Sequence, residues 1–190
     1  MHILKELMFP KFHIMKKVIQ KNNIAPERIF IIGFMGAGKT TIGEALAGKL
    51  MWEFRDTDTL VRERAGKSIP EIFASEGEAR FREIENKIVR ELCLERKTVI
   101  ATGGGIPCDP DNIQLMTDKG FVISLQADAR TLYDRIKNEK GRPLLKDWHY
   151  FKSLYDERKE YYTNGDIIIN VTESNRDDIL SDILQQLGNK

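Results

Sequence analysis

The stretch GFMGAGKTT, residues 33–41, decides the fold. It follows the spacing Gly-x-x-x-x-Gly-Lys-Thr, which is the pattern of a phosphate-binding loop, or P-loop. The apolar run RIFII (28–32) before it predicts a buried strand, and IGEALAGKL after it predicts a helix over about 39–50. A P-loop requires this order of strand, loop and helix, so a simple glycine-rich turn is the weaker interpretation.

The loop residues predict a site for a nucleoside triphosphate. Glycines let main-chain N–H groups and the helix N-terminus approach phosphate oxygens, where side chains would block them. Lys39 can reach the β- and γ-phosphates, and the Thr40 hydroxyl can ligate Mg²⁺.

Apolar runs and helical patterns alternate through the rest of the chain. Further strands are predicted at WEFRD (52–56), TVIATGGG (98–105), FVISL (121–125) and DIIIN (166–170), with helices near 128–137 and 176–187. Continuous apolar strands indicate burial on both faces, hence a parallel sheet, and the alternation predicts one doubly wound α/β domain.

Two capping boxes precede the longest helical pattern, Ser68-x-x-Glu71 and Ser75-x-x-Glu78. The second is expected to open the helix EGEARFREIENKIVREL. Its apolar stripe has helical spacing and consists of Phe81, Ile84, Ile88, Val89 and Leu92.

Composition excludes several classes of protein. The 190 residues suit one domain, and 30 Lys and Arg against 29 Asp and Glu leave no basic excess of the kind that nucleic-acid binding needs. Cys93 and Cys108 lack zinc-ligand spacing and suggest a reducing compartment, so a cytoplasmic location is expected. No apolar run reaches the ~18 residues of a membrane helix, so no membrane partner is expected.

Residues 1–27 are interpreted as an N-terminal extension that is basic and mildly amphipathic. They lack the apolar region and the cleavage site of a signal peptide, and scarce Ser with Glu6 argues against a transit peptide. Three interpretations stay open: Met15 is the true start, the segment is an extra docked helix, or it is a surface anchor.

The stretch RDTD brings Asp56 and Asp58 to the carboxyl end of the second strand. Ligands of open α/β sheets bind at that edge, so one carboxylate could hold Mg²⁺ through water and the other could take a proton from an attacking hydroxyl. A helix cap is the alternative interpretation of such a pair. A guanine-nucleotide switch is not supported, since the chain has no Asn-Lys-x-Asp element.

Two more stretches suggest a second ligand. ATGGG places three glycines, Gly103, Gly104 and Gly105, after a strand, where a bare backbone permits close approach; a plain turn is the alternative. FREIE places Arg82 and Glu85 on one side of the long helix, where a surface ion pair is the alternative.

Three arginines, Arg135, Arg142 and Arg158, complete the candidate set, although each alone could be solvated surface. Guanidinium groups bind phosphates and anionic acceptors through paired hydrogen bonds. The Lys- and Gly-rich segment at about 138–150 is predicted to be a lid that excludes water from phosphoryl transfer.

Together these motifs resemble the shikimate kinase family from about residue 28 to the C-terminus. The resemblance rests on GFMGAGKTTIG, FRDTD, SIPEIFASEGEARFREIE, ATGGG, GRPLL and ERKEYY, in the family's order and near its spacing. It implies the nucleoside-monophosphate-kinase type of P-loop fold: a three-layer α/β/α domain over 28–190, with a five-stranded parallel sheet in the order 2-3-1-4-5. It also implies a cytoplasmic monomer that makes shikimate 3-phosphate from ATP and shikimate, in the pathway to chorismate and aromatic amino acids.

The resemblance further implies roles for individual residues. Arg135, Arg142 and Arg176 join the ATP-binding loop residues Gly36, Ala37, Gly38, Lys39, Thr40 and Thr41. Mg²⁺ would lie on Thr40 and, through water, near Asp56. The acceptor would meet Asp58, Arg82, Gly103, Gly104, Gly105 and Arg158. Lys39, Asp58 and Arg142 would be catalytic, with Asp58 the base or proton trap.

Two rival functions stay open. One is a kinase of the same fold for another small polyol acid such as gluconate, since Arg82 with Arg158 indicates a carboxylate but does not choose the ring. The other is a non-catalytic nucleotide-binding module, which the full set of polar groups argues against.

Overall fold

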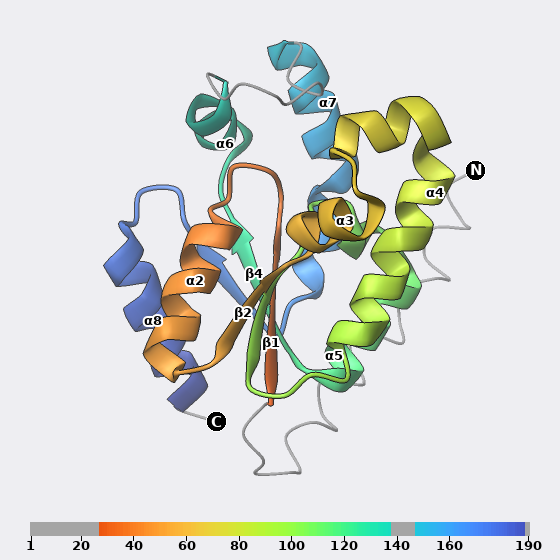
Figure 1. The fold of residues 1–190 in the computed structure, drawn as a ribbon. Helices are drawn as coiled ribbons and strands as arrows, with labels where there is room; N and C mark the ends of the chain where they lie inside the picture. The colour runs from red at the N-terminus through yellow and green to blue at the C-terminus, as the bar shows by residue number, and fades with distance from the viewer. Residues whose placement is uncertain (1–26, 138–146, 189–190) are drawn as a thin grey trace, which may run out of the picture.

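The computed structural model describes residues 27–137 and 147–188. Their centre is a parallel sheet in the order β2-β3-β1-β4-β5, as predicted (Figure 1). The strands are β1 (Arg28–Gly33), β2 (Glu53–Asp56), β3 (Thr98–Ala101), β4 (Phe121–Gln126) and β5 (Ile167–Asn170). All carboxyl ends therefore meet at one edge, and the P-loop follows the central strand β1.

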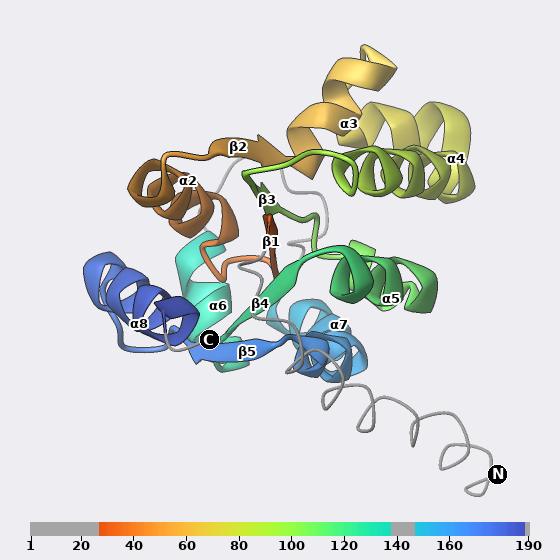
Figure 2. The same cartoon turned by 90° about the horizontal axis from the view of Figure 1, so that it is seen from below.

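Helices cover both faces of the sheet and confirm the three-layer arrangement (Figure 2). The α-helices are α2 (Lys39–Leu50), α3 (Thr57–Ala65), α4 (Ile69–Leu92), α5 (Pro110–Lys119), α6 (Ala129–Ile136), α7 (Trp148–Arg158) and α8 (Arg176–Gly188). Two short 3₁₀ turns are η2 (Ile106–Cys108) and η3 (Lys159–Asn164). In the described part of the chain, no helix is both long and apolar enough to cross a membrane.

Two hydrophobic clusters, one on each face, hold the layers together. Alternate residues of β1 enter different clusters: Ile31 packs with α2 and α8, and Phe30 packs with α4 and α5. Successive side chains of a strand point to opposite faces, so a strand with helices on both sides must be apolar throughout. This explains why RIFII reads as a continuous apolar run.

The edge strand β5 departs from the expectation that every strand is buried on both faces. Its residues alternate between buried and exposed, and Ile168 is 49% exposed. β5 lies at the edge of the sheet, and its apolar run DIIIN does not guarantee that the helix layers extend over both of its faces.

The two predicted capping boxes have different outcomes. Ser68 and Glu71 form the first one at the start of α4, with both reciprocal hydrogen bonds. The second prediction was wrong: Ser75 lies inside α4, where its hydroxyl donates to the Glu71 carbonyl. The chain does leave helical geometry nearby, at Gly77 (φ 81°, ψ 171°), where α4 consists of two helical segments joined at a kink. The second segment therefore starts close to the predicted position, but Ser75 does not cap it.

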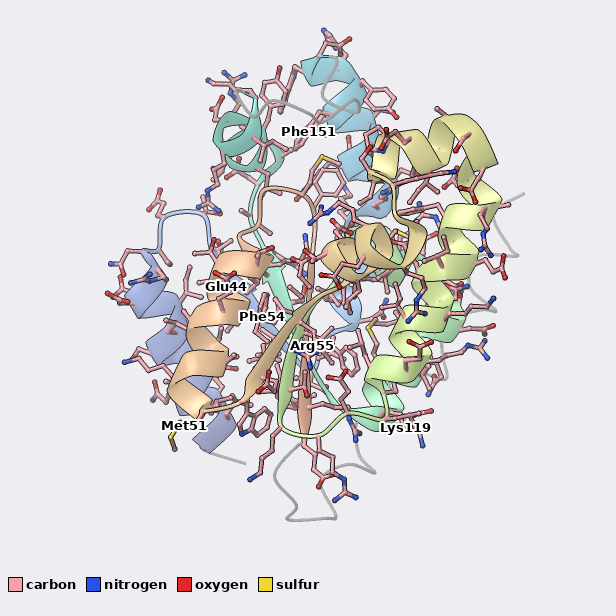
Figure 3. The ribbon with its side chains drawn as sticks, in the orientation of Figure 1. Glu44, Met51, Phe54, Arg55, Lys119 and Phe151 are labelled. Atoms are coloured by element: carbon pink, nitrogen blue, oxygen red, sulfur yellow. The ribbon has the colours of Figure 1, made fainter. Side chains whose placement is uncertain are left out.

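Helices α6 and α7 stand over the carboxyl edge of the sheet and flank the predicted lid. Phe151 of α7 lies between them (Figure 3), with its ring centroid 5.2 Å from that of Tyr133 on α6. Of the predicted lid, 138–150, the last three residues form the start of α7, which Asp147 caps, and the role of the segment as a lid stays a prediction. Residues 138–146, including Arg142, lie outside the described residues, as do residues 1–26 of the predicted extension.

Candidate active site

The P-loop connects β1 to the N-terminus of α2. Gly36 and Gly38 adopt positive φ angles of 82° and 85°, which side chains rarely tolerate. Lys39 folds back over the loop, and its Nζ donates to the carbonyl oxygens of Gly33 (2.9 Å) and Phe34 (3.0 Å). The loop thus offers main-chain N–H groups, a helix N-terminus and an ammonium group to a polyphosphate.

Thr40 and Asp56 lie together, as a shared metal site requires. The Thr40 hydroxyl donates to Asp56 Oδ2 at 2.8 Å. The other carboxylate oxygen, Oδ1, accepts from the amides of Asp58 (3.0 Å) and Thr59 (3.2 Å) and so caps α3. The helix-cap interpretation of RDTD is therefore correct for one oxygen of Asp56, while the second oxygen faces the P-loop.

Asp58 lies in the first turn of α3, against the glycine segment that follows β3. A Cβ built on Gly103 would be 2.6 Å from Asp58 Oδ1 and 3.0 Å from Glu85 Oε1. The absence of a side chain at Gly103 is what allows two carboxyl groups from different helices to meet there. The turn-only interpretation of ATGGG does not account for this contact.

Arg82 is fixed beside the same segment by two carboxylates of α4. Its Nη1 donates to Glu85 at 2.5 Å and its Nη2 to Glu78 at 3.0 Å. A Cβ on Gly105 would be only 2.2 Å from Arg82 Nη1, so this glycine also makes room for a polar side chain. The Glu85 side chain is only 2% exposed, so the pair is not the surface ion pair that was the alternative.

Burial is the main influence on the Glu85 carboxyl. It raises the pKa of Glu85 to about 7, against the opposing effect of the Arg82 charge, and the nearby Asp58 raises it further. The charge of Arg158 also lowers this pKa, which puts Arg158 within electrostatic reach of the same carboxyl. Two carboxyls and two guanidiniums thus gather around the glycine segment.

The backbone of the glycine segment leaves two donors available. Gly103 N donates to the Thr57 hydroxyl at 2.7 Å, and Gly104 O accepts from the Tyr162 hydroxyl at 2.7 Å. Within residues 27–137 and 147–188, the amides of Gly104 and Gly105 donate to no protein acceptor. Two such N–H groups beside Arg82 can bind hydroxyl or carboxylate oxygens of a ligand.

Arg135 and Arg176, the two arginines predicted to bind ATP that lie among the described residues, differ in their surroundings. Arg135 contacts the P-loop, with Nη1 3.4 Å from Gly36 O, and its Nη2 donates to Val171 O at 2.6 Å. Arg176 is exposed at the start of α8, where its Nε pairs with Asp177 at 3.5 Å, so its place beside the nucleotide stays a prediction.

Comparison with known proteins identifies this site. The shikimate kinase family model matches residues 35–188. The chain belongs to the shikimate kinase family. Curated shikimate kinases from Sulfurihydrogenibium sp. (strain YO3AOP1) and Moorella thermoacetica are 38% and 43% identical to it. These alignments span 85% and 76% of this chain, and 98% and 84% of the relatives.

Solved shikimate kinases have the same fold. The enzyme from Bacteroides thetaiotaomicron aligns with a TM-score of 0.80 and 34% identity, over 86% of this chain and 99% of that one. The Acinetobacter baumannii enzyme in complex with shikimate aligns with a TM-score of 0.82 and 33% identity, over 92% and 98%. A gluconokinase from Sinorhizobium meliloti 1021 reaches 0.56 at 15% identity over 87% and 93%, which shows a shared fold alone.

Three residues of this shikimate kinase site were not given a role from the sequence. Thr57 and Tyr162 bind the backbone of the glycine segment, and Glu85 was noted only as the partner of Arg82. Thr57 stands between the two aspartates of RDTD and Tyr162 ends ERKEYY, so both lay inside quoted motifs. Nothing in the spacing indicates that either side chain reaches a glycine loop after another strand.

Proposed function

We propose that this chain transfers the γ-phosphoryl group of ATP to the 3-hydroxyl of shikimate, giving ADP and shikimate 3-phosphate. The observation that carries the proposal is the meeting of Asp58, Glu85 and Arg82 around Gly103 and Gly105, at the sheet edge that also carries the P-loop. A cyclic acid with several hydroxyls needs such a mixture of carboxyl, guanidinium and amide groups.

The acceptor would be held by its carboxylate and its hydroxyls. Arg82 and Arg158 would bind the carboxylate, and the amides of Gly104 and Gly105 would donate to oxygens on the ring or its carboxylate. Asp58 would accept the proton of the attacking hydroxyl as the new bond to phosphorus forms and the bond to the leaving ADP oxygen breaks. Glu85 would keep Arg82 in place from its buried position.

The nucleotide would lie on residues 36–41, with Arg135 near the adenine. Lys39 would leave the carbonyls that it contacts and donate to the transferring phosphate, whose negative charge it would balance together with Arg142. Closure of the segment that holds Arg142 would exclude water and suppress ATP hydrolysis.

The residues present fit a magnesium ion. A hydroxyl and a carboxylate oxygen 2.8 Å apart, Thr40 Oγ1 and Asp56 Oδ2, are the hard oxygen donors that Mg²⁺ prefers. Among the described residues no three His, Cys, Asp or Glu side chains form a metal cluster, so phosphate oxygens and water would supply the other ligands. When bound, the ion supplies positive charge that neutralises the β- and γ-phosphates.

A coupled assay of ADP release tests the proposal. With ATP and Mg²⁺, shikimate should give turnover at least about a hundredfold faster, as kcat/KM, than gluconate or nucleoside monophosphates. Equal turnover with gluconate would replace the proposed acceptor by a broader class of polyol acids. ATP binding without turnover on any of these acceptors would instead indicate a non-catalytic nucleotide-binding module.

We also propose that the protein works as a monomer in the cytoplasm. Both cysteines are free thiols, Cys93 buried and Cys108 partly buried, which suits a reducing compartment. Sedimentation equilibrium at assay concentrations tests the monomer: a mass near 21.9 kDa supports it, and twice that mass rejects it.

A further inference from the structure

We infer that the Tyr162 hydroxyl is a positioning group for the acceptor: it orients the peptide between Gly104 and Gly105 so that the Gly105 amide can donate to the ligand. The inference rests on the proposed function and extends it to a residue outside the P-loop, the aspartates and the arginines. The Tyr162 hydroxyl bonds to the backbone oxygen of Gly104, so its effect on the acceptor is indirect.

The contact that carries the inference joins two segments far apart in the sequence. Tyr162 Oη donates to Gly104 O at 2.7 Å. In a planar trans peptide, the carbonyl of one residue and the N–H of the next point in opposite directions. Holding Gly104 O toward Tyr162 therefore turns the Gly105 N–H away from it, and this N–H donates to no acceptor in the described part of the protein.

A glycine peptide needs such an external restraint. Glycine has wide backbone freedom, and three in succession form a segment that would otherwise sample several orientations. Neighbouring groups are already fixed: Gly103 N by Thr57, Gly103 O by the Ile106 amide, and Gly105 O by the Cys108 amide. The peptide between them is held at Gly104 O by the Tyr162 hydroxyl at 2.7 Å, with only the weak thiol donor Cys108 Sγ at 4.0 Å beside it.

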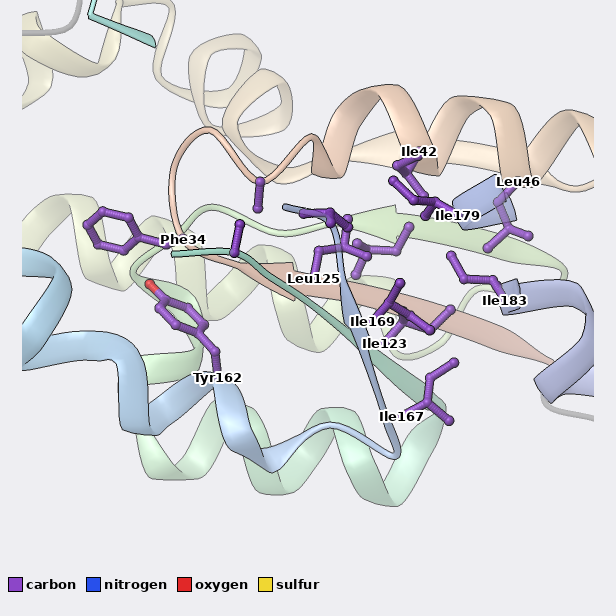
Figure 4. Close-up of a cluster of buried hydrophobic side chains, with 14 of the residues drawn as sticks. Phe34, Ile42, Leu46, Ile123, Leu125, Tyr162, Ile167, Ile169, Ile179 and Ile183 are labelled. Carbon is purple, nitrogen blue, oxygen red and sulfur yellow. The ribbon is translucent and has the colours of Figure 1, made fainter. Parts of the chain in front are cut away.

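Tyr162 itself is held from both ends, so it can act as a rigid support. Its backbone oxygen accepts from Ser124 Oγ at 2.5 Å and from Gln126 Nε2 at 2.9 Å, which ties η3 to β4. Its ring is 97% buried beside Phe34, with centroids 6.1 Å apart (Figure 4). Burial raises the pKa of the phenol, so it stays protonated and donates.

The same aromatic cluster offers a matched control, Tyr155. Its ring also packs edge-to-face on Phe34, with centroids 5.5 Å apart, and its hydroxyl also donates to a backbone carbonyl, Ala127 O, at 3.1 Å. Tyr155→Phe and Tyr162→Phe thus remove equivalent hydrogen bonds beside the same ring. Only the second removes one from the glycine segment.

Steady-state kinetics separates positioning from general structural damage. Tyr162→Phe should raise the KM for shikimate about tenfold, while kcat and the KM for ATP change less than about twofold. Tyr155→Phe should leave all three within about twofold of wild type. Equal KM values for shikimate in the two variants, or an equal rise in the KM for ATP, would overturn the inference.

A measurement on the free protein keeps this test independent of the proposed function. Residual dipolar couplings of ¹⁵N-labelled protein report the direction of the Gly105 N–H bond directly. The Gly105 coupling should change in Tyr162→Phe and keep its wild-type value in Tyr155→Phe; an unchanged value in both variants overturns the inference. If shikimate is not phosphorylated at all, the proposed function fails, and the couplings still decide whether Tyr162 orients the peptide.

Discussion

Replacing Gly105 by alanine tests the link between the glycine segment and Arg82. The backbone of Gly105, with φ −87° and ψ −21°, suits alanine without strain, so the variant should fold. The added Cβ, however, would lie 2.2 Å from Arg82 Nη1 and 2.9 Å from its Cζ. Ordinary contacts begin at 3.4 Å, so the guanidinium must retreat by more than about 1 Å.

The retreat has a definite consequence for binding. Arg82 Nη1 is 2.5 Å from the buried carboxyl of Glu85, and a shift of that size breaks this hydrogen bond or turns the guanidinium out of the site. A hydrogen bond to a charged group contributes about 1.5–3 kcal/mol. Loss of one such bond to the acceptor's carboxylate should therefore raise the KM for shikimate between about 10-fold and about 150-fold.

The assay compares two Gly-to-Ala variants. Gly48 is exposed on α2, and a Cβ there meets no atom within 4 Å, so Gly48→Ala makes the same chemical change without the collision. Gly105→Ala should lose shikimate affinity and keep its KM for ATP, and Gly48→Ala should keep both. A KM for shikimate within about twofold of wild type in Gly105→Ala would refute the assignment of Arg82 to the acceptor site.

Three further predictions follow from individual contacts. Asp58→Asn should bind nucleotide with wild-type affinity but lose turnover by about 10²–10⁴, measured by nucleotide titration and ADP release; retained turnover would remove Asp58 from the role of base. Burial raises the pKa of Glu85 to about 7 from 4.5, so its contribution to stability is complete below pH 4.5 and is lost as pH rises through 7. Urea unfolding should show wild type losing about 3 kcal/mol over this window relative to Glu85→Gln, and parallel pH profiles would contradict the assignment. Gly48→Ala should raise the free energy of unfolding by about 0.5–1 kcal/mol, because alanine is the better helix former at an open position. An unchanged urea midpoint would contradict this predicted stabilisation of α2.

Local features of this protein follow from its sequence alone. The spacing of Gly38, Lys39 and Thr40 between an apolar run and a helical pattern predicts the P-loop and its helix. The alternation of strands and helices predicts the three layers, and the resemblance to shikimate kinases supplied the strand order that the structure confirms. These features depend on residues that are close together in the sequence. They are therefore visible as a hydrophobic period of about 3.6 residues in helices and about 2 residues in strands.

The errors lie where a local pattern has two outcomes. Ser75 has the spacing of a helix cap but bonds to the carbonyl of Glu71 inside α4. DIIIN has the continuous apolar composition of a strand buried on both faces, but residues of β5 alternate between buried and exposed. In both cases, the surrounding structure chose between arrangements that the local residues allow.

The working geometry of the site was decided by tertiary structure. Thr40 meets Asp56 across 16 residues, because the sheet order brings the carboxyl ends of β1, β2 and β3 together. Tyr162 of η3 meets Gly104 across 58 residues. The burial of Glu85, which changes an apparent surface ion pair into a buried support for Arg82, depends on how α4 packs against the glycine segment. Contacts of this kind depend on side-chain directions from separate elements, and spacing along one chain does not specify where two elements meet.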